Sequence, residues 1–220
     1  MQLNGAVQRD PERSVQINSD QIVVGGHEVE RERKIYLMMN KPRGLVTTAS
    51  DEKGRETVYS VLAGESLPWV APVGRLDKAS EGLLLLTNDS EWGARVAAPE
   101  THLEKTYHVQ IGTTETSSVI AAILGGINVD GQTLTAKECR LLRSGEKNCW
   151  LEIILDEGKN RQIRRMVAKL GVEVLRLLRV SIGPLQLGTL AKGTYRSLSP
   201  GEKSALDRAM KKTPNSMSSR

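Results

Sequence analysis

Four consecutive leucines, Leu83 to Leu86, are the feature that most restricts how this chain can fold. Such a run belongs in a protein interior, because burying one leucine side chain contributes about 1.5–3 kcal/mol to stability. The stretch GRLDKAS, residues 74–80, comes directly before the run, so Arg75 and Asp77 are carried to the edge of the core. A charge at that place is unfavourable unless it has a partner or a function. We therefore expect these two side chains to have one or the other.

Length and composition indicate a globular protein. The 220 residues suffice for one large domain, or for one domain with a small appendage. We expect a cytoplasmic protein with no membrane partner, since the chain lacks both a long apolar stretch and a signal peptide. Cys139 and Cys149 are then expected to be reduced core thiols. The histidines lack the spacing of metal ligands, so no metal site is expected.

The formal charge of +5 and the pI near 9.3 are compatible with a nucleic-acid partner. Basic residues concentrate between residues 159 and 179, where seven basic side chains occur with one acid, Glu173. A solvated helix face also explains such a run. The charge pattern alone leaves both explanations open.

Hydrophobic periodicity predicts strands and helices without strict alternation, which indicates an α+β fold. Strands are expected at 34–40, at 105–111, on both sides of the turn 144–147, and at 173–188. In the second of these, Tyr107, Val109 and Ile111 share one face. Helices are expected from the cap Ser90 to Pro99, at 114–124, at 160–171, and from a capping box at Ser199 and Glu202 to about residue 211.

The two ends of the chain differ from the middle. Residues 1–30 have the pattern of short strands and turns, and residues 31–34 that of a polar hinge. These first residues are too few to bury a core of their own. Residues 213–220 have the composition of a disordered tail.

Four motifs follow one another along the chain: NKPRG at 40–44, GRLDKASEGLLLLTND at 74–89, EKTYHV at 104–109 and EGKNRQIRRM at 157–166. Together they closely resemble the RNA pseudouridine synthases of the RsuA-like family, which modify ribosomal RNA. The resemblance covers about residues 34 to 200. It implies the pseudouridine synthase fold, a largely antiparallel mixed sheet flanked by helices with a central RNA-binding cleft. Residues 34–212 would be the catalytic domain, and residues 1–33 resemble the strand half of an S-four-type RNA-binding module without its helical half.

The resemblance also implies a role for each matching residue. Asp77 matches the single catalytic aspartate, Tyr107 the tyrosine that stacks on the target base, and Arg164 the basic partner of the aspartate. Arg75 matches the arginine that fills the gap left by the extruded nucleotide. Five further basic residues are expected to bind RNA, namely Lys41, Lys105, Lys159, Arg161 and Arg165.

Helical periodicity supports this assignment for the arginines of NRQIRRM. Arg164 lies at the margin of the expected buried face, where its side chain can reach into a cleft while its stem packs. Arg161 and Arg165 lie roughly opposite that face. We therefore expect Arg164 to pair with Asp77, and the other two arginines to contribute electrostatic attraction to RNA only.

The implied reaction requires no cofactor and no metal, because it breaks a carbon–nitrogen glycosidic bond and joins the sugar to carbon 5 of the same base. The target base must first be flipped out of its stack. A carboxylate can form a covalent intermediate or act as a base that leads to a glycal, and the sequence favours neither route. No second acid stands out, unlike in glycosidases that use two carboxylates.

Simpler interpretations apply to the same residues. Asp77 also fits a turn, Tyr107 a core position, and Lys41 with Pro42 and Gly44 a turn that ends a strand. The alternative function is a non-catalytic protein that binds ribosomal RNA or assists its assembly on the same fold. A nucleoside hydrolase does not fit the motifs. We expect a monomer, and the target uridine is left open.

Overall fold

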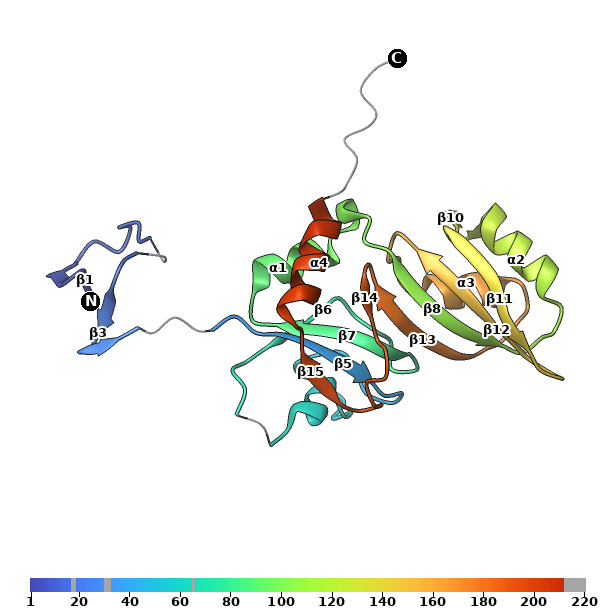
Figure 1. Cartoon of the computed structure of the whole chain (residues 1–220), viewed down its shortest axis with the longest axis horizontal. Coiled ribbons are helices and arrows are strands. Elements are labelled where there is room, and N and C mark those ends of the chain that lie inside the picture. The colour runs from blue at the N-terminus through green and yellow to red at the C-terminus, as the bar shows by residue number, and fades with distance from the viewer. Residues whose placement is uncertain (17–18, 30–32, 65, 212–220) are drawn as a thin grey trace, which may run out of the picture. The chain divides into compact units, whose positions relative to one another are not determined.

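The computed structural model describes residues 1–16, 19–29, 33–64 and 66–211 (Figure 1). The chain divides into two compact units, Met1–Arg33 and Lys34–Arg220. The predicted tail at 213–220 lies outside the described residues. Every helix that the structure describes is too short or too polar to cross a membrane.

The small unit is a four-stranded antiparallel sheet with the order β2-β1-β3-β4. Its strands are β1 Gln2–Leu3, β2 Ala6–Val7, β3 Ile22–Val24 and β4 His27–Glu28. The short strands and turns expected for this segment are confirmed. Its origin as half of an S-four-type module stays a prediction.

The larger unit is built on a nine-stranded sheet with the order β11-β12-β8-β13-β7-β5-β15, in which β14 pairs with β13 and β6 pairs with β7. All pairs are antiparallel except β7 with β13. The bounds are β5 Tyr36–Lys41, β6 Ala71–Val73, β7 Glu81–Thr87, β8 Lys105–Ile111, β11 Glu138–Ser144, β12 Cys149–Leu155, β13 Val174–Ile182, β14 Leu185–Gln186 and β15 Tyr195–Ser197. A largely antiparallel mixed sheet with flanking helices confirms the expected α+β class.

The expected helices are present, with small differences at their ends. They are α1 Ser90–Ala97, α2 Thr116–Gly125, α3 Gln162–Lys169 and α4 Pro200–Lys211, with 3-10 turns at η1 Val58–Leu62 and η2 Pro99–Thr101 and a hairpin of β9 Ile127–Val129 and β10 Gln132–Leu134. The capping box of α4 is confirmed, since Glu202 N–H donates to Ser199 Oγ and Ser199 N–H donates to the Glu202 carboxylate. The prediction that Ser90 caps the first helix is wrong, because the side chain of the preceding residue, Asp89, accepts the hydrogen bond from Trp92 N–H.

The leucine run forms the centre of β7, which is buried along its whole length. Leu83 and Leu85 pack on one face in a cluster with α1 and α4. Leu84 and Leu86 pack on the opposite face, under the segment between β5 and β6. A strand that is buried on both faces accounts for an apolar run without alternation.

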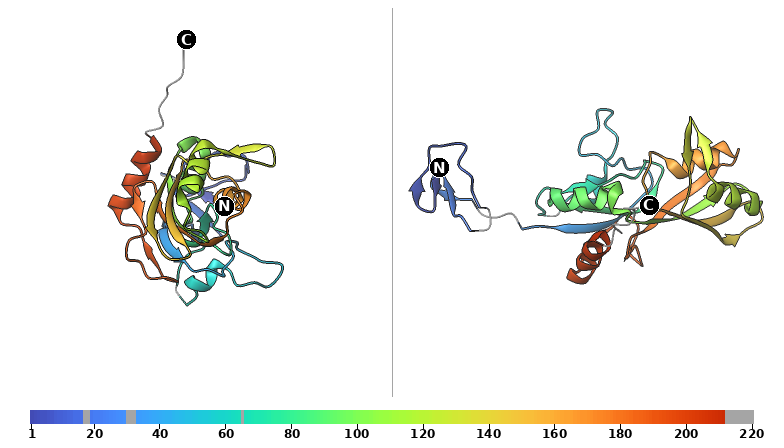
Figure 2. Two further views of the ribbon diagram at one scale, coloured as in Figure 1. Left: turned by 90° about the vertical axis from the view of Figure 1, so that its right-hand side faces the viewer. Right: turned by 90° about the horizontal axis from the view of Figure 1, so that it is seen from above.

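In the other half of the sheet, the helices α2 and α3 pack on β8 and β12 in a third cluster, and the right view of Figure 2 shows α2, in yellow-green, beside the strands of this half. Val109 and Ile111 of β8 are fully buried in this cluster, and Tyr107 packs at its border. Cys139 and Cys149 are buried free cysteines, as the core interpretation predicted. Burial raises the pKa of the Cys139 thiol to about 11.

Gly82 lies where β7 and β13 meet. Its φ is +100°, and it pairs with Arg179 across the parallel contact. A Cβ atom at this position would lie 2.3 Å from the Arg179 carbonyl oxygen and 2.9 Å from the Arg179 nitrogen. Both neighbours are backbone atoms of a strand, so they cannot rotate away. Only glycine permits this approach of the two strands.

Replacing Gly82 should therefore be severely destabilising. We expect Gly82→Ala to lower the free energy of unfolding by about 3 kcal/mol or more, because the strand contact must open to relieve the clash. Gly125→Ala is the matched control, since Gly125 ends α2 with open space around its Cα and no positive φ. Urea denaturation of both variants tests this. Equal stability of the two variants would contradict it.

Candidate active site

A cleft of about 400 Å³ lies between the loop before β7, the start of β8 and the segment that leads into α3. Six of the residues selected from the sequence line it, namely Arg75, Asp77, Lys105, Tyr107, Lys159 and Arg161. These residues come from three motifs that lie far apart along the chain. A volume of this size is typical of sites for small molecules.

The loop 74–80 holds Asp77 at the cleft. Gly74, with a φ of +69°, turns the chain directly after β6, and Leu76 is buried. Thr47 Oγ1 donates a hydrogen bond to the Leu76 carbonyl at 2.8 Å. Ser80 N–H donates to the Asp77 carbonyl at 2.9 Å. The backbone is thus fixed on both sides of Asp77, while its carboxylate stays partly exposed to the cleft.

Lys41 stabilises this loop from inside the protein. Its ammonium group donates to the carbonyls of Pro42, Asp77 and Ser80 at 3.0, 3.2 and 2.9 Å. The side chain is fully buried, so the expectation that Lys41 binds RNA is wrong. Burial lowers the pKa of Lys41 to about 8, and the carboxylate of Asp77 acts in the opposite direction. Lys41 thus holds the main chain of the loop 74–80 at Asp77 and at Ser80.

Arg161 is the ion-pair partner of Asp77, with 3.2 Å between Arg161 Nη1 and Asp77 Oδ2. Arg161 lies directly before α3, in the left-handed region with a φ of +48°. The direction of the Arg161 side chain is therefore not set by helical periodicity. The expectation that Arg161 contributes only electrostatic attraction to RNA is wrong, because Arg161 lies before α3, outside the helix on which the helix-face argument placed it, and binds Asp77.

Arg164 lies close to the same loop but does not form the expected pair with Asp77. Its Nη2 donates to the Ala79 carbonyl at 2.9 Å. The side chain is half-buried, and burial lowers its pKa, with a further lowering by the charge of Arg161. Arg164 thus supports the backbone of the loop. A direct role in chemistry stays a prediction.

The remaining selected residues fall into two groups. Tyr107 and Lys105 lie on the cleft wall formed by β8, where Tyr107 also packs against the core. Its core packing is confirmed, and stacking on a target base stays a prediction. Burial lowers the pKa of Lys105, as does the nearby Arg179. Arg75 is exposed at the cleft, and its role toward RNA stays a prediction. Arg165 binds Asp130 and is not part of the lining.

Glu157 is a second carboxylate in the cleft that the sequence analysis did not single out. Lys159 binds it at 2.8 Å, and Gln162 Nε2 donates to it at 3.1 Å. Both partners hold it in the segment before α3. Among the described residues, no group of three or more histidine, cysteine, aspartate or glutamate side chains is arranged to hold a metal ion.

The geometry can be compared with known proteins. The sequence profile of the family described as RNA pseudouridylate synthase matches residues 35–169, which is more than half of the chain. The chain belongs to this family. The resemblance noted from the four motifs is confirmed, and the cleft with Asp77 lies within the matched region.

Two relatives in the family cover most of the chain. An uncharacterized RNA pseudouridine synthase of Rickettsia typhi is 36% identical over 200 residues, which make up 90% of this chain and 81% of the relative. The ribosomal large subunit pseudouridine synthase B of Bacillus subtilis is 37% identical over 187 residues, or 84% of this chain and 76% of the relative.

Solved structures support the same fold. A crystal structure of a pseudouridylate synthase aligns with a TM-score of 0.68 and 31% identity, covering 93% of this chain and 87% of that chain. An archaeal box H/ACA complex of Nop10 and Cbf5 aligns with a TM-score of 0.50 and 16% identity, covering 72% of this chain and 51% of that chain. At that identity the second alignment shows a shared fold alone.

Removing the Lys41 ammonium should loosen the cleft loop. We expect Lys41→Met to lower the free energy of unfolding by about 1–3 kcal/mol, because three carbonyls lose their donor. Lys78→Met is the control, since Lys78 lies exposed in the same loop. Chemical denaturation of both variants measures the effect. Equal stability would show that the buried ammonium does not hold the loop.

The arginine pairing predicts which variant affects the reaction. We expect Arg161→Ala to lower the single-turnover rate constant at saturating RNA by about tenfold, because Asp77 loses the group that orients it. Arg165→Ala removes the same charge from α3 outside the cleft and should leave this rate constant nearly unchanged. Equal rate constants for the two variants would contradict a positioning role for Arg161.

Proposed function

We propose that this protein isomerises a specific uridine of ribosomal RNA to pseudouridine. The observation that carries the proposal is a carboxylate, Asp77, held on a rigid loop in a cleft lined with cationic side chains. Family membership and the similarity to a Bacillus subtilis enzyme named for the large ribosomal subunit support it. The RNA partner would be a stem–loop or a precursor of a ribosomal subunit. Action as a monomer in the cytoplasm remains part of the proposal.

The catalytic group in this proposal is Asp77. Its carboxylate attacks the target nucleoside or removes a proton from the ribose, and the bond between carbon 1′ and N1 breaks. The uracil turns within the cleft, and carbon 5 bonds to carbon 1′. This step releases the carboxylate from the nucleoside or, in the route through a glycal, returns the abstracted proton to the ribose. Carbon 5 then loses its proton and N1 gains one, so substrate and product have the same composition. Arg161 orients the carboxylate through their ion pair.

The other cleft residues would handle the flipped nucleotide. Extrusion of a base costs a few kcal/mol, and stacking on an aromatic side chain returns about 1–3 kcal/mol. We assign the stacking to Tyr107, which lines the cleft on β8. Arg75, exposed at the cleft, would fill the space left in the RNA. Lys105 and Lys159 would bind phosphates near the target, with Arg165 contributing from outside the cleft.

Asp77→Asn should abolish pseudouridine formation while leaving the fold and RNA binding nearly intact, because an amide has the same shape but is a poor nucleophile and base. The measurement is pseudouridine mapping in ribosomal RNA incubated with each purified variant. Asp130→Asn, which removes an exposed acid paired with Arg165, is the control and should stay active. More than trace product from a folded Asp77→Asn variant would contradict the catalytic assignment. RNA binding without product from the unaltered protein would favour the non-catalytic alternative.

A further inference from the structure

A row of side chains crosses four neighbouring strands of the main sheet. Arg143 of β11 pairs with Trp150 of β12, Trp150 pairs with Gln110 of β8, and Gln110 pairs with Arg176 of β13. Side chains of paired residues share one face of a sheet. The two guanidinium groups fit this arrangement, since they lie 5.0 and 5.6 Å from the centre of the Trp150 ring.

This row lies on the sheet face opposite α2 and α3. Successive residues of a strand point to opposite faces. Leu151 and Val109, the neighbours of Trp150 and Gln110, are buried against those two helices. Trp150 is only partly buried and Arg143 is exposed. The row is thus accessible from solvent in this half of the molecule.

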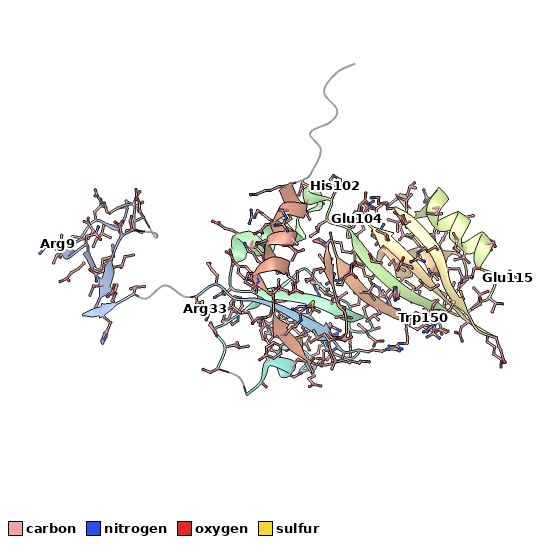
Figure 3. All side chains as sticks on the ribbon, in the orientation of Figure 1. Arg9, Arg33, His102, Glu104, Glu115 and Trp150 are labelled. Carbon is pink, nitrogen blue, oxygen red and sulfur yellow. The ribbon has the colours of Figure 1, made fainter. Side chains whose placement is uncertain are left out.

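Trp150, which is labelled in Figure 3, lies between the two arginines. Contact with an aromatic ring positions a guanidinium group while leaving its N–H edges able to donate. Among the residues that the structure describes, the Arg143 guanidinium contacts this ring and has no acceptor. The N–H groups of the Arg143 guanidinium are therefore available to bind an external acceptor.

Two acids near the row, Glu81 and Glu152, lie deeper than the cations that bind them. Glu81 binds Arg176 and Lys192 at 3.1 and 2.7 Å, and its side chain is 4% exposed, compared with 45% and 53% for these partners. Glu152 is 17% exposed, whereas the Arg140 that binds it is 64% exposed. Glu138, on β11, is an exposed acid at the border of this face. The surface presented by the row is cationic despite the ion pairs beneath it.

One end of the row lies near the backbone of the loop that carries Asp77, on the sheet face opposite the one on which Tyr107, Ile163 and Leu177 line the cleft. Glu81, which Arg176 and Lys192 both bind, directly follows Ser80, whose carbonyl accepts a hydrogen bond from Lys41. Lys192 precedes Gly193, whose N–H donates to the Asn40 carbonyl beside the same lysine. We refer to Arg143, Trp150, Arg176 and Lys192 as the basic strip. One end of the basic strip adjoins the loop that carries Asp77.

We propose that the basic strip binds the sugar–phosphate backbone of the substrate RNA outside the flipped nucleotide, in a single-stranded segment next to the target stem–loop. This inference rests on the proposed function. Strand spacing gives about 14 Å from the backbone of Arg143 to that of Arg176, so one extended RNA segment can contact both side chains. Free arginine donors on an open face suit phosphates, which position an RNA without reading its sequence.

The experiment compares two labelled RNAs, a stem–loop alone and the same stem–loop with a single-stranded extension. Equilibrium Kd values are measured at several salt concentrations for the full chain and for Arg143→Ala and Trp150→Leu. Arg208→Ala is the matched control, because it removes an exposed arginine from α4. Thermal denaturation checks the fold of each variant. If Trp150→Leu does not fold, the Kd of Arg143→Ala for the extended RNA still tests the proposal, because Arg143 is exposed.

Arg143→Ala should weaken binding of the extended RNA about threefold or more and reduce the slope of log K against log salt by about 0.7. The stem–loop alone should bind each variant almost equally well. Unchanged binding of the extended RNA, or an equal loss for Arg208→Ala, would overturn the proposal. A change in the oligomeric state of the Arg143→Ala variant would also overturn the proposal, because it would show that this face contacts protein. Because binding is measured without turnover, a failure of the basic strip is distinguishable from a failure of the proposed isomerisation.

Discussion

The parallel contact between β7 and β13 is the constraint on which the larger unit depends. It joins the strands β11, β12, β8 and β13 to the strands β7, β5 and β15. Gly82 allows the two backbones to meet, and Arg179 Nε donates to the Leu83 carbonyl across the junction at 2.8 Å. Asp77 lies a few residues before this contact. The candidate active site therefore draws one wall from each half of the sheet, and its geometry follows from how the halves are joined.

Two buried charges near this junction have fixed partners. The Lys41 ammonium is surrounded by carbonyl oxygens, and the Glu81 carboxylate is bound by Arg176 and Lys192. A buried charge is strongly unfavourable without such partners. Each group ties together segments that are distant in sequence, so both contribute rigidity where the loop must hold Asp77. The carboxylate itself stays partly exposed and available to a substrate.

Much of the candidate site could be predicted from the sequence, because the motifs carry the residues that line the cleft. The errors concern side chains whose direction depends on distant segments. Lys41 was expected to bind RNA, but β7 and the cleft loop enclose it. Arg161 was expected on a helix, but α3 begins only at Gln162. The left-handed backbone of Arg161 directs its side chain toward Asp77. Glu157 did not stand out because its place in the cleft depends on how the segment before α3 folds back.

The sequence by itself determined the local elements and the family. Apolar periodicity set the helices and several strands, the leucine run required a buried segment, and the ordered motifs identified a pseudouridine synthase. These features depend on neighbours along the chain, so they are visible in the sequence. The tertiary structure decided which arginine pairs with Asp77, which lysine is buried, and which face of the sheet presents Arg143 and Arg176. Those outcomes depend on strand order and register, which bring distant residues within a few ångströms and which periodicity along one segment cannot specify.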